Sequence, residues 1–308
     1  MDKQRLKRWV KLFSQIVIAT IAIYFVLNEI DVDELKRSLL GARIGPLIIA
    51  FLAFNASKML SAFRLNYFFR VLGLKLSENF NLKLYYLGML YNQFLPGGIG
   101  GDGYKVYLLN KTYKTPLKGL IAATLLDRIS GVVALGFLAV GLGLLGSAKD
   151  AMEGYGFLLW VALVLAYPAY YLLVNIFFKT FKKVNHITNL QALGVQSLQL
   201  VSAYFILKAL HVETGFIDYF TLFLVSSVLA ALPFSLPGGL GVRELTFTVG
   251  HELFGLNETA AVALASLFFL ITLISSLIGI FYLKIGKHLP KSDATTPTAS
   301  ELGEQPKA

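Results

Sequence analysis

Charged side chains interrupt apolar stretches of this sequence that are long enough to cross a lipid bilayer. Asp127 and Arg128 lie well inside the stretch that begins at Lys118, and Lys58 lies inside an earlier one. An ionisable group at that depth costs roughly 2.5–3.5 kcal/mol on insertion scales, so it faces the protein interior and needs a partner. One interpretation is that Arg128 and Lys58 bind a phosphate group while Asp127 balances the charge. The alternative is that Asp127 and Arg128 form a buried structural pair.

Lys58 belongs to a polar row in which Asn55, Lys58, Ser61 and Arg64 recur at steps of three. On a helix this spacing gives an inclined ridge, which can line a path for a polar headgroup. The alternative is that Arg64 extends to the cytoplasmic membrane surface and leaves only Lys58 deep. The sequence favours the path for Lys58 and the surface position for Arg64.

A helix-breaking motif occurs twice in the chain. Residues 94–100 read FLPGGIG, and residues 235–241 read SLPGGLG. Proline and consecutive glycines break a helix, and the backbone groups that they free within hydrocarbon must find partners. A duplicated break at membrane depth is typical of a transporter built from two related halves. Free N–H groups at the breaks also offer an anion site. The residues predicted to form it are Gly97, Gly98, Gly238 and Gly239.

Polar side chains flank both breaks. They are Asn92, Gln93, Asp102 and Lys105 at the first break, and Arg243 and Glu244 at the second. Buried amides need hydrogen-bond partners, so we place Asn92 and Gln93 at a binding site. We expect Asp102 and the Arg243–Glu244 pair to gate opposite mouths of one cavity. Helix capping directly after each break is an alternative that is compatible with gating.

Composition places the chain among membrane proteins. It is 56% hydrophobic and 15% charged over 308 residues, and its mean hydropathy is +0.65. The absence of cysteine excludes disulfides and thiolate metal sites in this sequence, and the scattered histidines indicate no metal site, so no cofactor is expected. The net charge of +10 indicates basic cytoplasmic loops in contact with anionic lipid headgroups, and no nucleic-acid partner is expected.

The distribution of lysine and arginine favours one topology. If all eight apolar segments crossed the membrane, a lysine-rich loop after the third would lie outside, against the positive-inside rule. If the third and seventh segments turn back at their breaks, six crossings remain, both termini are cytoplasmic, and the two hairpins enter from opposite sides. The alternative is that the breaks only kink two crossing helices. The eight segments are residues 9–28, 45–69, 81–96, 118–146, 155–178, 188–210, 217–237 and 258–285.

The predicted fold is therefore an all-α polytopic membrane protein. It has about six full transmembrane helices and two oppositely oriented re-entrant hairpins in an inverted repeat, or eight helices. Residues 1–8 form a basic cytoplasmic N-terminus, and residues 9–286 form the transmembrane domain. Residues 287–308 are rich in Pro, Ser, Thr and Glu and are predicted to be a disordered cytoplasmic tail.

Three motifs resemble the lysylphosphatidylglycerol synthase transmembrane-region family, a group of flippase-like membrane proteins. Residues 92–102 read NQFLPGGIGGD, residues 126–131 read LDRISG, and residues 236–244 read LPGGLGVRE. The resemblance covers about residues 9–285 and implies a multi-pass protein of a bacterial or archaeal inner membrane. In larger relatives this region moves lysylated phosphatidylglycerol between leaflets, and a separate soluble domain attaches the amino acid. We expect no such domain here, and hence no synthase activity.

The sequence and the resemblance together favour a lipid flippase. It would move a phosphate-bearing amphiphile, either a phospholipid or a lipid-linked precursor, between leaflets and would not be an enzyme. A homo-oligomer is compatible with the sequence. One alternative is a membrane enzyme that modifies lipid-linked phosphates or sugars, for which Asp102 and Asp127 are the candidate bases. The other is a partner subunit that does not itself transport.

Overall fold

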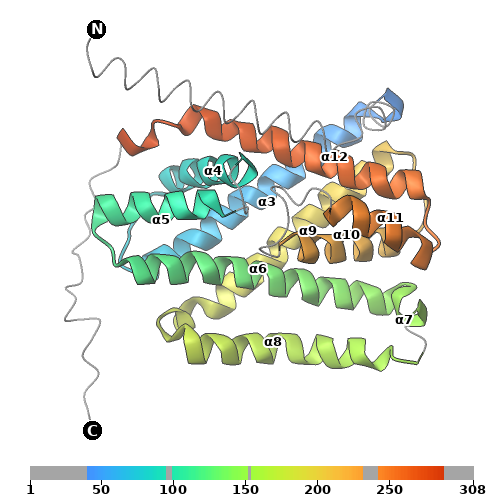
Figure 1. Cartoon of the computed structure of the whole chain (residues 1–308), viewed down its shortest axis with the longest axis horizontal. Helices are drawn as coiled ribbons and strands as arrows, with labels where there is room; N and C mark the ends of the chain where they lie inside the picture. The colour runs from blue at the N-terminus through green and yellow to red at the C-terminus, as the bar shows by residue number, and fades with distance from the viewer. Residues whose placement is uncertain (1–39, 95–98, 152–153, 232–241, 288–308) are drawn as a thin grey trace.

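The computed structural model describes residues 40–94, 99–151, 154–231 and 242–287 (Figure 1). Over these residues the regular elements are all helices, which confirms the predicted all-α class. The elements are α3 (Ile44–Val71), α4 (Glu78–Phe94), α5 (Gly100–Tyr113), α6 (Leu117–Leu145), α7 (Ala148–Ala151), α8 (Phe157–Phe177), η2 (Lys179–Val184), α9 (Asn185–Ala209), α10 (Phe216–Ala230), α11 (Val242–Leu253), α12 (Glu258–Leu277), η4 (Ile278–Tyr282) and η5 (Ile285–Lys287).

Five of these helical stretches are long and apolar enough to cross a membrane. They match five of the six predicted crossings, and the sixth, residues 9–28, lies outside the described residues. The helices before the two breaks are shorter, with 17 residues in α4 and 15 in α10. At 1.5 Å per residue these helices are about 26 and 23 Å long, less than the roughly 30 Å of a bilayer core. The five stretches are Ile44–Val71, Leu117–Leu145, Phe157–Phe177, Lys179–Ala209 and Glu258–Tyr282.

The chain turns back on itself after α4. The Gly101 N–H donates to Asn92 Oδ1 at 2.7 Å, and Lys105 Nζ lies 4.9 Å from the centre of the Tyr85 ring. Later residues of α5 therefore contact earlier residues of α4, so the two helices are antiparallel. A kinked helix would continue in one direction, so the kink interpretation is wrong for this pair.

The second break also joins two antiparallel helices. Arg243 Nη1 in α11 donates to Ser227 Oγ in α10 at 3.0 Å. Further along α11, a methyl group at Gly250 would lie 2.3 Å from Leu222 Cδ1, which is earlier in α10. Both copies of the motif thus precede a helix that runs back along the one before it.

The two hairpins have opposite orientations. α3 is antiparallel to both α4 and α6, and α6 is antiparallel to α10, so α4 and α10 run in opposite directions. An inverted repeat requires this relation. The long helices that precede the two hairpins, α3 and α9, are also antiparallel to each other. Ser202 Oγ donates to the Ala50 carbonyl, and the Arg43 N–H donates to the Ala209 carbonyl. For α3 and α4 the contacts are Asn81 to Ala62 and Tyr86 to Asn55. For α3 and α6 they are Asp127 to Arg64 and Gly119 to Leu72, which directly follows α3. For α6 and α10 they are Asp218 to Ser147, just after α6, and Thr221 to Gly143.

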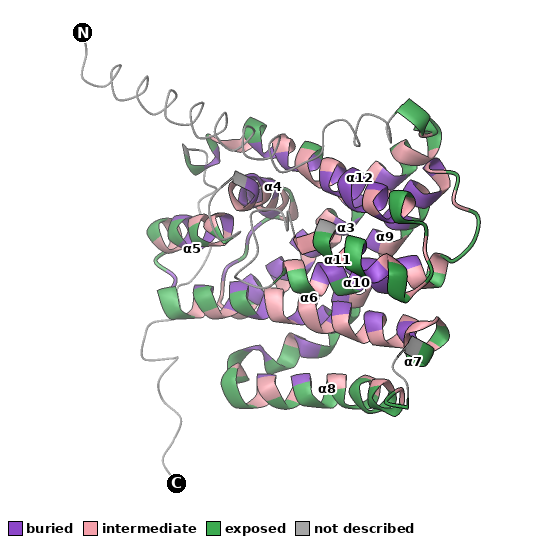
Figure 2. Ribbon diagram, turned by 45° about the vertical axis from the view of Figure 1, so that its right-hand side comes forward, coloured by how far each residue is buried: buried purple, intermediate pink, exposed green. Residues whose placement is uncertain are grey.

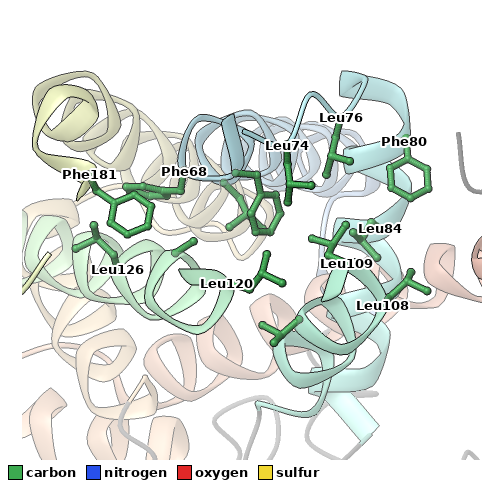
Figure 3. Packing of buried hydrophobic residues seen from close by; sticks show 14 of the residues in the cluster. Phe68, Leu74, Leu76, Phe80, Leu84, Leu108, Leu109, Leu120, Leu126 and Phe181 are labelled. Carbon is green, nitrogen blue, oxygen red and sulfur yellow. The ribbon is translucent and has the colours of Figure 1, made fainter. Parts of the chain in front are cut away.

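Each hairpin has its own hydrophobic core. The cluster around α4 and α5 includes Leu84, Leu109 and Leu120 (Figure 3), and the cluster around α10 and α11 includes Phe223 and Phe247. The long helices α3 and α6 contribute residues to both clusters. They therefore connect the two halves, while each hairpin keeps a separate set of packing contacts.

Helix α8 lies at the edge of the bundle and faces outward with apolar side chains (Figure 2). Trp160, Val164 and Leu165 are exposed, and within this helix only Tyr170 and Val174 are buried. A broad exposed apolar surface of this kind is typical of contact with lipid rather than water.

Positive charge gathers at one end of the bundle, at the left of Figure 1. The α3–α4, α5–α6 and α8–α9 connections meet there with the end of α12, and we call it the basic end. Its cations are Arg70, Lys75, Lys83, Lys111, Lys114, Lys118, Lys179, Lys182, Lys183 and Lys284. The opposite end has Arg43, Lys149 and Lys208, together with Asp150, Glu213, Asp218, Glu252 and Glu258. This asymmetry is the one that the positive-inside rule associates with a cytoplasmic face.

Candidate functional site

A close backbone approach positions the first hairpin. A methyl group at Gly101 would lie 1.8 Å from the Gly88 carbonyl oxygen. Only glycine allows this contact, so the first turn of α5 lies directly against α4. Asp102, the next residue, then reaches α6.

The Asp102 carboxylate lies between two cations. Lys105 Nζ is 2.8 Å from one oxygen, and Arg128 Nε of α6 forms an ion pair with the other. The Lys105 side chain is 5% exposed, whereas that of Arg128 is 37% exposed. Arg128 therefore holds the hairpin against α6 and also presents a surface that an arriving anion can reach.

Asp127 forms its ion pair with Arg64 of α3, not with Arg128. Arg64 Nε is 2.7 Å from Asp127 Oδ1, and Nη2 donates to the Asp127 carbonyl at 3.1 Å. Both side chains are almost fully buried. Consecutive residues on a helix do not face each other, so Asp127 and Arg128 point to different neighbours. The expectation that Arg64 lies at the membrane surface was wrong, as was the proposed pair between Asp127 and Arg128.

Lys58 lies in a positively charged neighbourhood. Its side chain is half-buried, and Nζ is 4.4 Å from the centre of the Phe54 ring. The charges that act on it are those of Arg243 and Arg64. Within the part of the chain that the structure describes, no carboxylate forms an ion pair with Lys58.

Arg243 holds the corresponding position at the second hairpin. Its guanidinium group donates to Ser227 Oγ at 3.0 Å and, more weakly, to Ser226 Oγ at 3.5 Å. The guanidinium carbon lies 5.3 Å from the ring centre of Phe268 and 5.7 Å from that of Phe223. These contacts orient the guanidinium through hydroxyl groups and rings.

The family of the chain follows from a comparison with protein-family models. The model of the lysylphosphatidylglycerol synthase TM region matches residues 12–279. The chain belongs to this family. The matched region includes both hairpins and nearly all of the five candidate spans. No curated protein sequence matches the chain.

The three motifs that carry the family resemblance contribute to a polar region of neighbouring charged side chains. Asp102 of α5 pairs with Arg128 of α6, and Arg243 of α11 is a charged neighbour of Lys58, as is Arg64. Among the described side chains of this region, the cations outnumber the carboxylates Asp102 and Asp127. The cations are Lys58, Arg64, Lys105, Arg128 and Arg243. If the charge of Glu244, whose side chain is not described, is counted as well, the cations still outnumber the carboxylates. The region therefore carries an excess of positive charge, in which Arg64 and Lys105 are buried and Lys58, Arg128 and Arg243 are partly exposed.

The amides before the first break differ in their contacts. Asn92 Oδ1 accepts the Gly101 N–H, so this side chain helps to begin α5. Gln93 is 5% exposed, and its Nε2 atom has no hydrogen-bond partner among the described residues. Gln93 thus has a donor for a ligand, whereas the Asn92 carbonyl oxygen is already used.

Some predicted site residues lie outside the described residues. They are Gly97, Gly98, Gly238 and Gly239, and the side chain of Glu244 is likewise not described. Their part in binding stays a prediction. The described residues contain no group of three or more His, Cys, Asp or Glu side chains placed to hold a metal ion.

Sequence reasoning missed the hydroxyl groups of Ser226 and Ser227 and the pairing of Arg64. Two adjacent serines in an apolar helix, just before the second break, were a usable signal because buried hydroxyls need partners. For Arg64 the usable signal was Asp127, a carboxylate deep in an apolar segment. The adjacent Arg128 could not neutralise Asp127, because consecutive residues on a helix do not face each other.

Proposed function

We propose that this protein is a lipid flippase or a related transporter, which moves a phosphate-bearing amphiphile between membrane leaflets. The substrate class is a phospholipid or a lipid-linked precursor. One observation carries the proposal: an excess of partly buried positive charge lies where two oppositely oriented hairpins meet two long helices. Membership of a family described by a lipid-synthase membrane region supports it.

In the proposed mechanism, Arg128 exchanges its partner. A headgroup phosphate approaches the exposed side of Arg128 and competes with Asp102 for the guanidinium, since both are anions that form charge-assisted hydrogen bonds. Lys105 keeps Asp102 neutralised when Arg128 leaves. The first hairpin then loses one of its contacts with α6 and can move.

Lys58 and Arg243 then provide the next positive charges along the path. Lys58 lies six residues from Arg64 on α3, about 9 Å along the helix axis, and on the side toward the second hairpin. The headgroup would pass from Arg128 to Lys58 and Arg243. Backbone N–H groups at the two glycine breaks would add neutral donors.

The positive-inside rule supports an orientation for this transporter. We propose that the basic end faces the cytoplasm of a bacterial or archaeal cell, that the protein lies in the inner (plasma) membrane, and that both termini are cytoplasmic. The first hairpin then opens toward the cytoplasm, and the second toward the other side.

A lipid-movement assay tests this function. Purified protein is reconstituted into liposomes that contain a fluorescent phospholipid, and an added impermeant quencher reports how fast inner-leaflet lipid becomes accessible. We expect Arg128→Ala to slow this movement about tenfold, and Lys58→Ala to slow it less. Arg70→Ala, an exposed arginine of the basic end, is the matched control and should match the wild type. Equal rates for the wild type and Arg128→Ala would overturn the role of Arg128.

The enzyme alternative has less support from the geometry. A general base needs a free oxygen, but both Asp102 oxygens are occupied by cations, and Asp127 is buried against Arg64. Mass spectrometry of lipids from a deletion strain separates the two functions. A flippase leaves every lipid species present with some in the wrong leaflet, whereas loss of one species would indicate an enzyme.

A further inference from the structure

A cavity lies at the basic end, away from the site described above. It has a volume of about 460 Å³ and lies where the start of α4 meets η4 and the residues that follow it. Its lining includes Ser77, Lys83, Phe80, Phe281, Tyr282 and Lys284. Lys83 lies near the start of α4, whereas Asn92 lies nine residues further on, about 14 Å along the axis. The cavity is therefore separate from the region around Asp102.

Two ammonium groups give this cavity its charge. Neither Lys83 nor Lys284 forms an ion pair with a carboxylate of the described residues. The nearest acidic residue in sequence, Glu78, forms an ion pair with Arg70. The cavity thus keeps two positive charges for an anion.

Neutral donors complete the polar side. Ser77 Oγ accepts the Phe80 N–H at 3.3 Å, which leaves the hydroxyl proton available to a ligand. Ser77 comes directly before α4, so N–H groups of the first turn point in the same direction. A phosphate diester has the acceptor oxygens and the negative charge that this set of donors matches.

Aromatic side chains form the other side of the cavity. Phe281 is 85% exposed, and Tyr282 lies beside it at the end of η4. An exposed phenylalanine beside lysines is unfavourable in water but suits the boundary between headgroups and acyl chains. A basic pocket between helices with an apolar edge therefore matches a phospholipid rather than a free phosphate ion.

We propose that this cavity binds the headgroup of an anionic phospholipid, with its acyl chains along Phe281. The bound lipid links α4, the first arm of the first hairpin, to η4, which follows α12 in the second half. This goes beyond the proposed transport, because a resident lipid here stabilises the contact between the halves and is not carried across. The anionic lipid content of the membrane then affects how tightly the first hairpin is held.

Lipid binding to the full chain tests the proposal. Protein in detergent is titrated with phosphatidylglycerol or with phosphatidylcholine of the same acyl chains, and native mass spectrometry counts the lipids retained. We expect the wild type to retain one phosphatidylglycerol about tenfold more tightly than phosphatidylcholine, and Lys83→Ala/Lys284→Ala to lose this preference.

The control is Lys182→Ala/Lys183→Ala, which removes two exposed lysines from the same end and should keep the preference. If the double cavity variant does not fold, Lys284→Glu alone, at an exposed position, should weaken phosphatidylglycerol binding by a similar factor. Equal retention of the two lipids by the wild type, or the same loss in the control pair, would overturn the proposal. The result does not depend on lipid movement, so it is independent of the flippase assay.

Discussion

The two hairpins share a backbone motif but are held in different ways. The first is fixed to α6 by the Asp102 carboxylate, which binds Lys105 and Arg128. At the second, Arg243 contacts a serine hydroxyl and lies over the Phe268 ring. The first hairpin is thus joined to α6 by an ion pair, whereas the hydrogen bond and ring contact described for Arg243 join α11 to α10 and α12. In the proposed mechanism, a substrate phosphate would displace Asp102 from Arg128 and so release the first hairpin.

The backbone contacts within the hairpins differ as well. Gly101 of the first hairpin meets backbone, the Gly88 carbonyl, whereas Gly250 of the second meets the end of the flexible Leu222 side chain. Backbone cannot move aside as a side-chain methyl group can. A methyl group added at Gly101 should therefore cost more stability than one added at Gly250.

The largest effect is expected from breaking the buried ion pair that joins α3 to α6. Arg64→Ala leaves Asp127 buried without its cation and should lower the free energy of unfolding by about 3–5 kcal/mol. Thermal unfolding in detergent measures this. Arg64→Met/Asp127→Leu removes both charges, so it should be more stable than Arg64→Ala. A double variant that is less stable would contradict the pairing.

The next effect compares glycines. Gly101→Ala forces α4 and α5 apart and should cost about 1–3 kcal/mol of stability. Gly103→Ala, two residues away with nothing within 4 Å of the added methyl group, is the matched control. Gly250→Ala should lie between them, because Leu222 can adopt another rotamer. Equal melting temperatures for Gly101→Ala and Gly103→Ala would show that the close approach is not required.

Releasing the first hairpin should change activity, at a cost in stability because Asp102 is also the ion-pair partner of the buried Lys105. Asp102→Asn keeps the size of the side chain but removes the charge that holds Arg128. We expect lipid movement in liposomes to become several-fold faster, because a headgroup phosphate no longer competes with a carboxylate for Arg128. A rate equal to that of the wild type would argue against partner exchange at Arg128.

The smallest effect is expected at the second hairpin. Ser227→Ala removes one hydrogen bond to Arg243 and should cost about 1 kcal/mol. Ser226→Ala is the control, since its contact with Arg243 is longer, at 3.5 Å, while both hydroxyls donate to the same Phe223 carbonyl. If Ser226→Ala costs more than Ser227→Ala, the assigned geometry of Arg243 is wrong.

The sequence predicted the hairpins because their signals are local. Pro-Gly-Gly breaks a helix wherever it occurs, and the lysines around Lys111 indicate which loops share one side. The partners of the buried charges were not predictable in this way. Which neighbour Asp127 faces depends on how α3 packs against α6, and that packing brings Arg64, 63 residues earlier, to the carboxylate. Adjacency in sequence suggested Arg128 instead, although neighbours on a helix diverge.

The opposite orientation of the hairpins is the central claim, and cysteine labelling tests it most directly. The chain has no cysteine, so single exposed replacements report sidedness without background. Lys118→Cys at the start of α6 and Glu252→Cys at the end of α11 are treated with an impermeant maleimide in intact cells and in inverted membrane vesicles. We expect Glu252→Cys to react in cells and Lys118→Cys only in inverted vesicles. Labelling of both from the same side, which eight crossing helices would give, would contradict the inverted hairpins.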